Sequence, residues 1–286
     1  MIKHWLQASR PLTLSASIAP ISIACLYAIK NGFFNSSWAS VVLLTAVLIQ
    51  VGTNFVNDYA DFEKGADNAK RKGPKRMVQA GLISVKQMKI AAALVFFLAF
   101  LLGLFLVYHA GIAILVIGLI SMLLGYMYTA GPFPLAYLGL ADLIVLLFFG
   151  PIATAGTAFV LNGQWHLDLV VTGLGVGCIS AALLAINNLR DCDEDKLSNK
   201  KTLVVRFGKH FGRFEYIGSL VLSIVCLGLT ASSFLSLSIV ALYAIVCLRL
   251  SIQLIRLAES MYITQLKRTG ILLYLYPLFY AGALFL

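Results

Sequence analysis

Long runs of apolar residues constrain this chain more than any other feature. Residues 94–107, 112–124 and 143–160 contain no charged side chain. Stretches of about 20 such residues cross a bilayer as helices, because a helix satisfies its own backbone hydrogen bonds. Strands of a membrane barrel would alternate apolar and polar residues, and these runs do not alternate. The sequence therefore predicts an all-α integral membrane protein.

The composition supports this class, since 60% of the residues are hydrophobic and only 12% are charged. Soluble domains carry about 25% charged residues. We expect a single polytopic domain over residues 1–286, and the first apolar run is interpreted as a retained membrane helix rather than a signal peptide. Hydropathy and span length predict about nine transmembrane helices, at residues 13–30, 39–57, 90–108, 111–128, 139–160, 168–189, 214–233, 235–257 and 269–286.

The net charge of +10 comes largely from two polar connections, residues 58–89 and 190–213. The connections that alternate with them are nearly free of Lys and Arg. This is the positive-inside pattern, and it predicts that the N-terminus and both polar connections are cytoplasmic. The topology accounts for the basic charge without a nucleic-acid partner. We expect both connections to be ordered, with short helices that cap the cytoplasmic mouth of the protein.

Acidic residues are clustered in the two polar connections. The chain has 12 acidic residues, and eight fall in two short windows: Asp58, Asp61, Glu63 and Asp67, then Asp191, Asp193, Glu194 and Asp195. Each window follows the end of a predicted span. Ionisable residues at such positions indicate a functional site more often than structure alone would explain.

Helical spacing places an amide and two carboxylates of each window on one face: Asn54, Asp58 and Asp61 in the first, and Asn188, Asp191 and Asp195 in the second. Like charges at these spacings repel unless a cation lies among them. Oxygen ligands without sulfur or imidazole suit Mg²⁺. We therefore predict catalytic, metal-binding roles for the four aspartates. Glu63, Asp193 and Glu194 lie off these faces and are expected to be solvated.

Basic residues follow both acidic windows, and Arg and Lys bind phosphate oxygens. We predict diphosphate contacts from the two asparagines and from four of the basic residues: Arg71, Arg76, Lys200 and Arg206. Two carboxylate faces, a divalent metal and a basic rim form a site for a diphosphate. Because the site lies at the end of membrane helices, the diphosphate would carry a membrane-soluble tail.

These same segments resemble the UbiA superfamily of intramembrane aromatic prenyltransferases, and most closely its 1,4-dihydroxy-2-naphthoate subgroup. The resemblance covers essentially the whole chain. It rests on Arg10-Pro11 and on residues 54–67 (NFVNDYADFEKGAD), 71–76 (RKGPKR), 128–132 (YTAGP), 148–151 (FFGP), 186–196 (INNLRDCDEDK) and 200–208 (KKTLVVRFG). The superfamily usually has a third Asp where this chain has Gly65. The Asp67 variant is typical of the naphthoate subgroup, and it adds Asp67 to the expected metal ligands.

The resemblance implies a helix bundle with a central cavity, Mg²⁺ as cofactor and a polyprenyl diphosphate donor. It implies prenyl transfer to 1,4-dihydroxy-2-naphthoate with loss of CO₂, which gives demethylmenaquinol in menaquinone biosynthesis. Tyr128 is the first candidate to shelter an allylic cation, with Tyr126 and Phe149 behind it. A bacterial inner membrane is the expected location. The two substrates and the bilayer are the only expected partners, with no nucleic acid and no obligate protein partner.

Two alternatives remain open at this stage. The acceptor could be 1,4-dihydroxy-6-naphthoate, 4-hydroxybenzoate or homogentisate, and the tail could be phytyl. A different class, a divalent-cation transporter, would place acidic residues near the middle of the spans. In this sequence the clustered aspartates lie at the ends of the spans, which favours the transferase.

Overall fold

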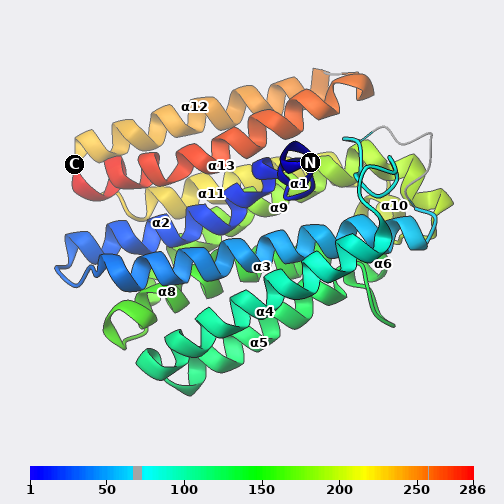
Figure 1. The fold of residues 1–286 in the computed structure, drawn as a ribbon. Coiled ribbons are helices and arrows are strands. Elements are labelled where there is room, and N and C mark those ends of the chain that lie inside the picture. Colours follow the sequence, from blue (N-terminus) through cyan, green and yellow to red (C-terminus); the bar gives the residue numbers. More distant parts are fainter. Residues whose placement is uncertain (67–72, 257) are drawn as a thin grey trace.

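The computed structural model describes residues 1–66, 73–256 and 258–286. All regular elements in these ranges are helices, and the long ones run side by side with the two termini at opposite ends (Figure 1). The long helices are α2 (Ser15–Lys30), α3 (Ser36–Glu63), α4 (Val85–Ala110), α5 (Ile112–Met127), α7 (Ala141–Leu147) with η2 (Phe148–Ile152) and α8 (Ala153–Asn162), α9 (Leu167–Leu197), α11 (Lys209–Gly228), α12 (Phe234–Arg256) and α13 (Tyr262–Phe285). The short ones are α1 (Ile2–Ala8), η1 (Pro11–Leu14), α6 (Leu135–Leu138), α10 (Leu203–Phe207) and η3 (Glu259–Met261).

The predicted all-α membrane class is confirmed. Within the described ranges, 7 helical segments are long and apolar enough to cross a membrane. Helix α5 is apolar but has only 16 residues, and α13 has 24 residues but is not among the seven. Every predicted span coincides with one of the long helical segments. Nine membrane crossings therefore remain a prediction.

Two helices extend beyond the predicted span ends. The polar connections were predicted to begin at residues 58 and 190, but α3 continues to Glu63 and α9 to Leu197. At about 1.5 Å per residue, both are longer than the roughly 30 Å apolar core of a bilayer. The extra turns form because their polar side chains find partners outside that core. The acidic windows therefore begin on rigid helices rather than in loops.

A polar cap lies at the end of the bundle where α3 and α9 finish, and α1, α6 and α10 lie at this same end (Figure 1). One expected cap helix is confirmed as α10, whose N-cap Thr202 accepts a hydrogen bond from the Val205 N–H. Between α3 and α4, the described residues 73–84 of the first connection form turns rather than the expected short helix.

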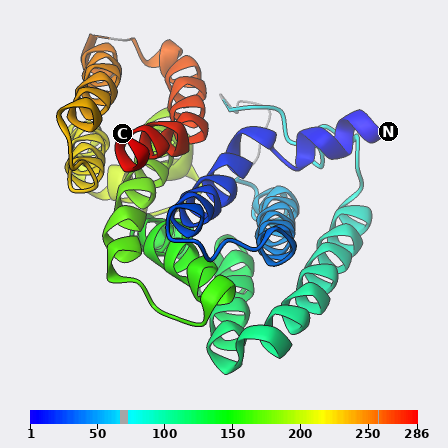
Figure 2. The same cartoon turned by 90° about the vertical axis from the view of Figure 1, so that its left-hand side faces the viewer.

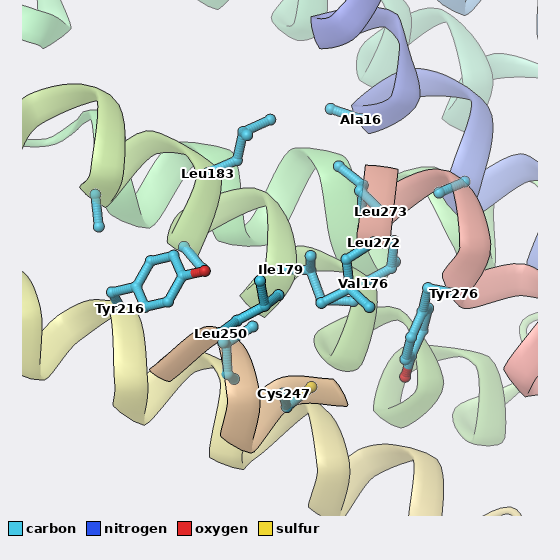
Figure 3. Packing of buried hydrophobic residues seen from close by; sticks show 14 of the residues in the cluster. Ala16, Val176, Ile179, Leu183, Tyr216, Cys247, Leu250, Leu272, Leu273 and Tyr276 are labelled. Carbon is cyan, nitrogen blue, oxygen red and sulfur yellow. The ribbon is translucent and has the colours of Figure 1, made fainter. Parts of the chain in front are cut away.

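Helix α9 forms the centre of the main core. Its buried face contributes Val176, Ile179 and Leu183, which meet side chains from α2, α11, α12 and α13 (Figure 3). On its other side α9 packs against η2 without intervening side chains, because a Cβ at Gly150 would lie 2.7 Å from the Gly173 carbonyl oxygen. Viewed end-on, α12 and α13 lie on one side of the bundle and α4 and α5 on the other, with α2 and α3 between them (Figure 2). The two motif-bearing helices, α3 and α9, are thereby fixed inside the bundle.

Candidate active site

Two cavities meet inside the polar end of the bundle. One is a pocket lined by many polar side chains, and the other is a largely apolar cavity. Five residues line both, and they mark the junction: Gln50, Thr53, Tyr128, Val145 and Phe149. A molecule with a polar head and an apolar tail could occupy both spaces at once.

The polar pocket collects side chains from α3, α9 and the two polar connections. Those predicted from the sequence are Asn54, Asp61, Arg76, Tyr128, Asn188, Asp191, Asp195 and Lys200. Those that the sequence analysis did not assign to the site are Arg10, Asn57, Asn187 and Glu194. Residues from the two acidic windows, more than 120 positions apart, thus line one pocket. Asp67 and Arg71, also predicted, lie outside the described residues.

Asp61 joins the two halves of the chain. Its side chain is 2% exposed, and it pairs with Arg76 at 3.3 Å and with Lys200 at 3.0 Å. A desolvated carboxylate is stable only with such partners. Arg76 comes from the first polar connection and Lys200 from the second, so one carboxylate holds both connections against the end of α3.

Asp191 is neutralised within its own helix. The neighbouring Arg190 donates from Nε and Nη2 to both carboxylate oxygens at 2.6 Å, and from Nη2 to Asn187 Oδ1 at 2.8 Å. Such bidentate pairs fix the orientation of both groups. Arg190 was interpreted from the sequence only as part of the topology signal, because its pairing with Asp191 depends on side-chain geometry.

Two asparagines of α3 anchor the pocket wall. Asn54 donates to the Ser9 carbonyl oxygen at 2.9 Å and to Thr13 Oγ1 at 3.1 Å. Asn57 accepts from Thr129 Oγ1 at 2.5 Å, which ties α3 to the segment after α5. Asn57 was not among the residues predicted from the sequence. The signal available was its spacing of four residues from Asp61, which places the two on one helix face.

Asp58, which the sequence predicts to bind metal, lines neither cavity in this structure and is only 1% exposed. Its two carboxylate oxygens accept the backbone N–H groups of Met77 at 3.1 Å and Val78 at 3.0 Å. Asp58 therefore lies at the edge of the helix face that carries Asn54 and Asp61, where it binds the turn after Arg76.

Three other residues lie differently from what the sequence suggested. Arg206 was expected at the diphosphate, but it is exposed and donates to the carbonyl oxygens of Lys201 at 3.0 Å and Leu138 at 2.8 Å. The position of Arg206 on the short helix α10 directs its side chain toward α6 rather than into the pocket. Glu194 was expected to be solvated but lines the pocket, whereas Tyr126 is 43% exposed and lines neither cavity.

The expectation for the remaining two acidic residues is confirmed. Glu63 and Asp193 are exposed on the surface, where they pair with Lys89 at 2.6 Å and Lys209 at 3.4 Å. Exposed pairs of this kind contribute little to stability. These two residues are therefore solvated surface charges, in contrast to the buried acidic residues.

Tyr128 lies at the junction of the two cavities. Its ring lies beside the polar pocket and shares the junction with the Phe149 ring. The faces of aromatic rings attract cations. The junction is suited to a positive charge that develops on a substrate.

The pocket's donors fit a hard divalent cation. The inward side chains offer carboxylate and amide oxygens, which are the ligands that Mg²⁺ prefers. Among the described residues, no three acidic, His or Cys side chains converge tightly enough to enclose an ion. Mg²⁺ commonly keeps waters and substrate phosphates in its coordination sphere. The donor set therefore suits an ion bound jointly with a phosphate group rather than held by protein alone.

The apolar cavity extends from the junction between α3, α4, α5 and the α7–α8 segment. Its walls include Gly103, Gly118 and Gly156, and a Cβ added at Gly103 or Gly118 would meet no atom within 4 Å. The glycines thus leave open space along the cavity. Together, the fold and the two cavities define an intramembrane protein whose site suits an amphiphile with an anionic head.

Comparison with known proteins gives this class a family. The model of the UbiA prenyltransferase family matches residues 17–276, and the chain belongs to this family. The chain is 36% identical to a 1,4-dihydroxy-2-naphthoate octaprenyltransferase of Haemophilus influenzae, over 79% of this chain and 76% of that one. It is 32% identical to the enzyme of the same name from Mycobacterium tuberculosis, over 77% and 75% of the two chains. It is therefore a membrane-bound transferase.

Solved structures show the same fold. A UbiA homolog from Archaeoglobus fulgidus, solved with DMAPP and Mg²⁺, has a TM-score of 0.68 at 14% identity, over 97% of this chain and 98% of that one. A digeranylgeranylglyceryl phosphate synthase has a TM-score of 0.60 at 20% identity, over 100% and 99%. At these identities the likeness establishes the architecture of the bundle and not the substrate.

Proposed function

We propose that this protein transfers a polyprenyl group from polyprenyl diphosphate to 1,4-dihydroxy-2-naphthoate, with Mg²⁺ and with loss of CO₂, to give demethylmenaquinol. The observation that carries the proposal is the polar pocket of paired Asp, Arg and Lys residues that opens into an apolar cavity at Tyr128. The naphthoate substrate in the names of the relatives supports the choice of acceptor. The basic polar end would face the cytoplasm of a bacterial inner membrane.

The pocket residues divide into two roles. Arg76 and Lys200 would bind the diphosphate oxygens. The resemblance to the family adds Arg71 to these two residues. The oxygens of Asn57, Asp61, Asn188, Asp191 and Asp195 would hold Mg²⁺, joined by Asp67 on the same grounds of resemblance. The bound metal would neutralise negative charge on the departing diphosphate.

Chemistry would occur at the junction. The C–O bond of the donor breaks, and the diphosphate leaves with the electron pair and stays in the polar pocket. The allylic cation left at the junction is stabilised by the rings of Tyr128 and Phe149. The acceptor carbon that carries the carboxylate forms the new C–C bond. Loss of that carboxylate as CO₂ returns an electron pair to the ring. Apolar walls exclude water, which would otherwise trap the cation.

A transfer assay tests the proposal. Purified protein in liposomes is supplied with farnesyl diphosphate, Mg²⁺ and a panel of aromatic acids, and prenylated product and CO₂ are measured. We expect equal amounts of both with 1,4-dihydroxy-2-naphthoate, abolished by EDTA and restored by Mg²⁺. Product with a different acid would change the identity of the proposed acceptor and leave the proposed mechanism unchanged. Folded protein without product from any acid and any donor length would refute the proposal.

A further inference from the structure

A buried carboxyl group contacts the site without lining it. Asp142 lies in the first turn of α7, is 6% exposed and lines neither cavity. Its Oδ1 accepts a hydrogen bond from Asn188 Nδ2 at 3.4 Å. Asn188 lines the polar pocket one helical turn before Asp191. The contact therefore links α7 to the motif helix α9 directly behind the pocket.

The contact determines how the Asn188 amide is oriented. A side-chain amide has one acceptor oxygen and one donor nitrogen, and its neighbours decide which way each points. Because Asp142 Oδ1 accepts, the Asn188 nitrogen is held at α7. The Asn188 oxygen is then the atom left for the pocket. An oxygen binds a hard cation, whereas an NH₂ group facing the pocket would repel it.

Asp142 is itself held from the opposite side. The carboxyl group of Glu215 on α11 lies within hydrogen-bonding reach of the Asp142 carboxyl group. Asp142 Oδ2 and Glu215 Oε2 are both buried and accept from no donor in the described part of the chain. Helices α7, α9 and α11 are joined in this way by three polar side chains.

We propose that Asp142 is a positioning residue that orients the Asn188 amide oxygen toward the metal–diphosphate site, with Glu215 fixing Asp142 in turn. This inference rests on the proposed function. It assigns a role to two acidic residues outside both acidic windows. Groups that orient metal ligands typically alter metal affinity about 10–100-fold when they are removed.

The test measures binding of inorganic diphosphate at increasing Mg²⁺ by calorimetry on purified protein in detergent. In Asp142→Ala we expect the Mg²⁺ concentration for half-maximal binding to rise about tenfold or more. The matched control is Asp168→Ala. Asp168 is also an acidic first-turn residue, but it lies at the far end of α9 and contacts Tyr27 at 3.5 Å. The control should bind like the parent, since a helix-terminal charge alone does not reach the site.

A reversed pair separates orientation from packing. Asp142→Asn combined with Asn188→Asp restores the hydrogen bond with its polarity exchanged, and one carboxylate oxygen again faces the pocket. We expect this double variant to bind within about threefold of the parent, while Asn188→Asp alone, with two facing carboxylates, binds worse. If Asp142→Ala does not fold, the double variant still tests whether Asp142 orients Asn188.

Three results would overturn the inference. Parent-like Mg²⁺ dependence in Asp142→Ala would show that Asn188 needs no orientation. A double variant no better than either single change would show that Asp142 acts through packing alone. If the parent bound diphosphate without any need for Mg²⁺, the proposed function would fail and the inference with it.

Discussion

Asp58 and Asp61 of the first acidic window should have different roles: Asp58 stabilises the fold, and Asp61 binds the ligands. Asp58 accepts two backbone N–H groups at 3.0 and 3.1 Å and is 1% exposed. Hydrogen bonds to a charged group contribute about 1.5–3 kcal/mol each, and the buried donors would be left unpaired. Asp58→Ala should therefore lower the free energy of unfolding by about 3 kcal/mol or more, which corresponds to about 6 °C or more in a chain of this size.

Asp61 should show the opposite behaviour. Its partners Arg76 and Lys200 line the pocket, where water can solvate them after the change Asp61→Asn. The loss of stability should then be smaller than for Asp58→Ala. Without the Asp61 carboxylate, however, Mg²⁺ and diphosphate should no longer stabilise the protein. A ligand that binds only the folded state raises the unfolding temperature. A variant whose unfolding temperature does not rise when the ligands are added has therefore lost binding.

The assay is thermal unfolding in detergent, with and without Mg²⁺ and inorganic diphosphate. Asp58→Ala should unfold early but still respond to the ligands, and Asp61→Asn should not respond. Glu63→Gln serves as the control, because Glu63 is exposed on the same helix and should change stability by less than about 0.5 kcal/mol. If Asp58→Ala unfolded at the parent temperature and no longer responded to ligands, Asp58 would be a metal ligand and its structural role would be wrong.

Two further predictions concern the junction and the tail. Tyr128→Leu should slow single-turnover transfer by about 30-fold, since a desolvated cation–π contact contributes about 2 kcal/mol, whereas Tyr128→Phe should retain most of the rate. Gly118→Leu should shift preference toward shorter prenyl donors, because the side chain would fill open cavity space without a clash. Gly218→Leu, on the exposed surface of α11 with no atom within 4 Å of an added Cβ, should leave donor preference unchanged.

The fold was predictable because a bilayer requires long apolar helices. The runs in residues 94–107, 112–124 and 143–160 all lie in helices of the structure. The ends of α3 and α9 were not predictable by hydropathy, which stops at the first polar residues. Those turns are helical because Asp58 and Asp191 find partners in another segment or on their own helix, and hydropathy carries no information about partners.

The site was predictable at the level of helices and less so at the level of side chains. Clustered acidic residues pointed to α3 and α9, and residues of both helices line the polar pocket. Within α3, however, Asn57 and Asp58 are adjacent, and only the packed bundle shows which of them faces the pocket. Asp142 gave no signal at all, because a single carboxyl group far from both windows becomes meaningful only through its contact with Asn188.

The charge balance of the pocket explains how its acidic residues can be buried and still be available to a ligand. In the structure Asp61 is held by Arg76 and Lys200, and Asp191 by Arg190. A divalent cation that bound alone at Asp61 would have to displace the Arg76 and Lys200 side chains. These two side chains would then lose their buried partner, which is costly. A diphosphate alone would place its charge beside carboxylates. When both arrive together, Arg76 and Lys200 can move to the phosphate oxygens as Asp61 turns to the metal, and every charge keeps a partner. The arrangement therefore favours cooperative binding of metal and diphosphate, and titration of either one in the absence of the other should show markedly weaker binding.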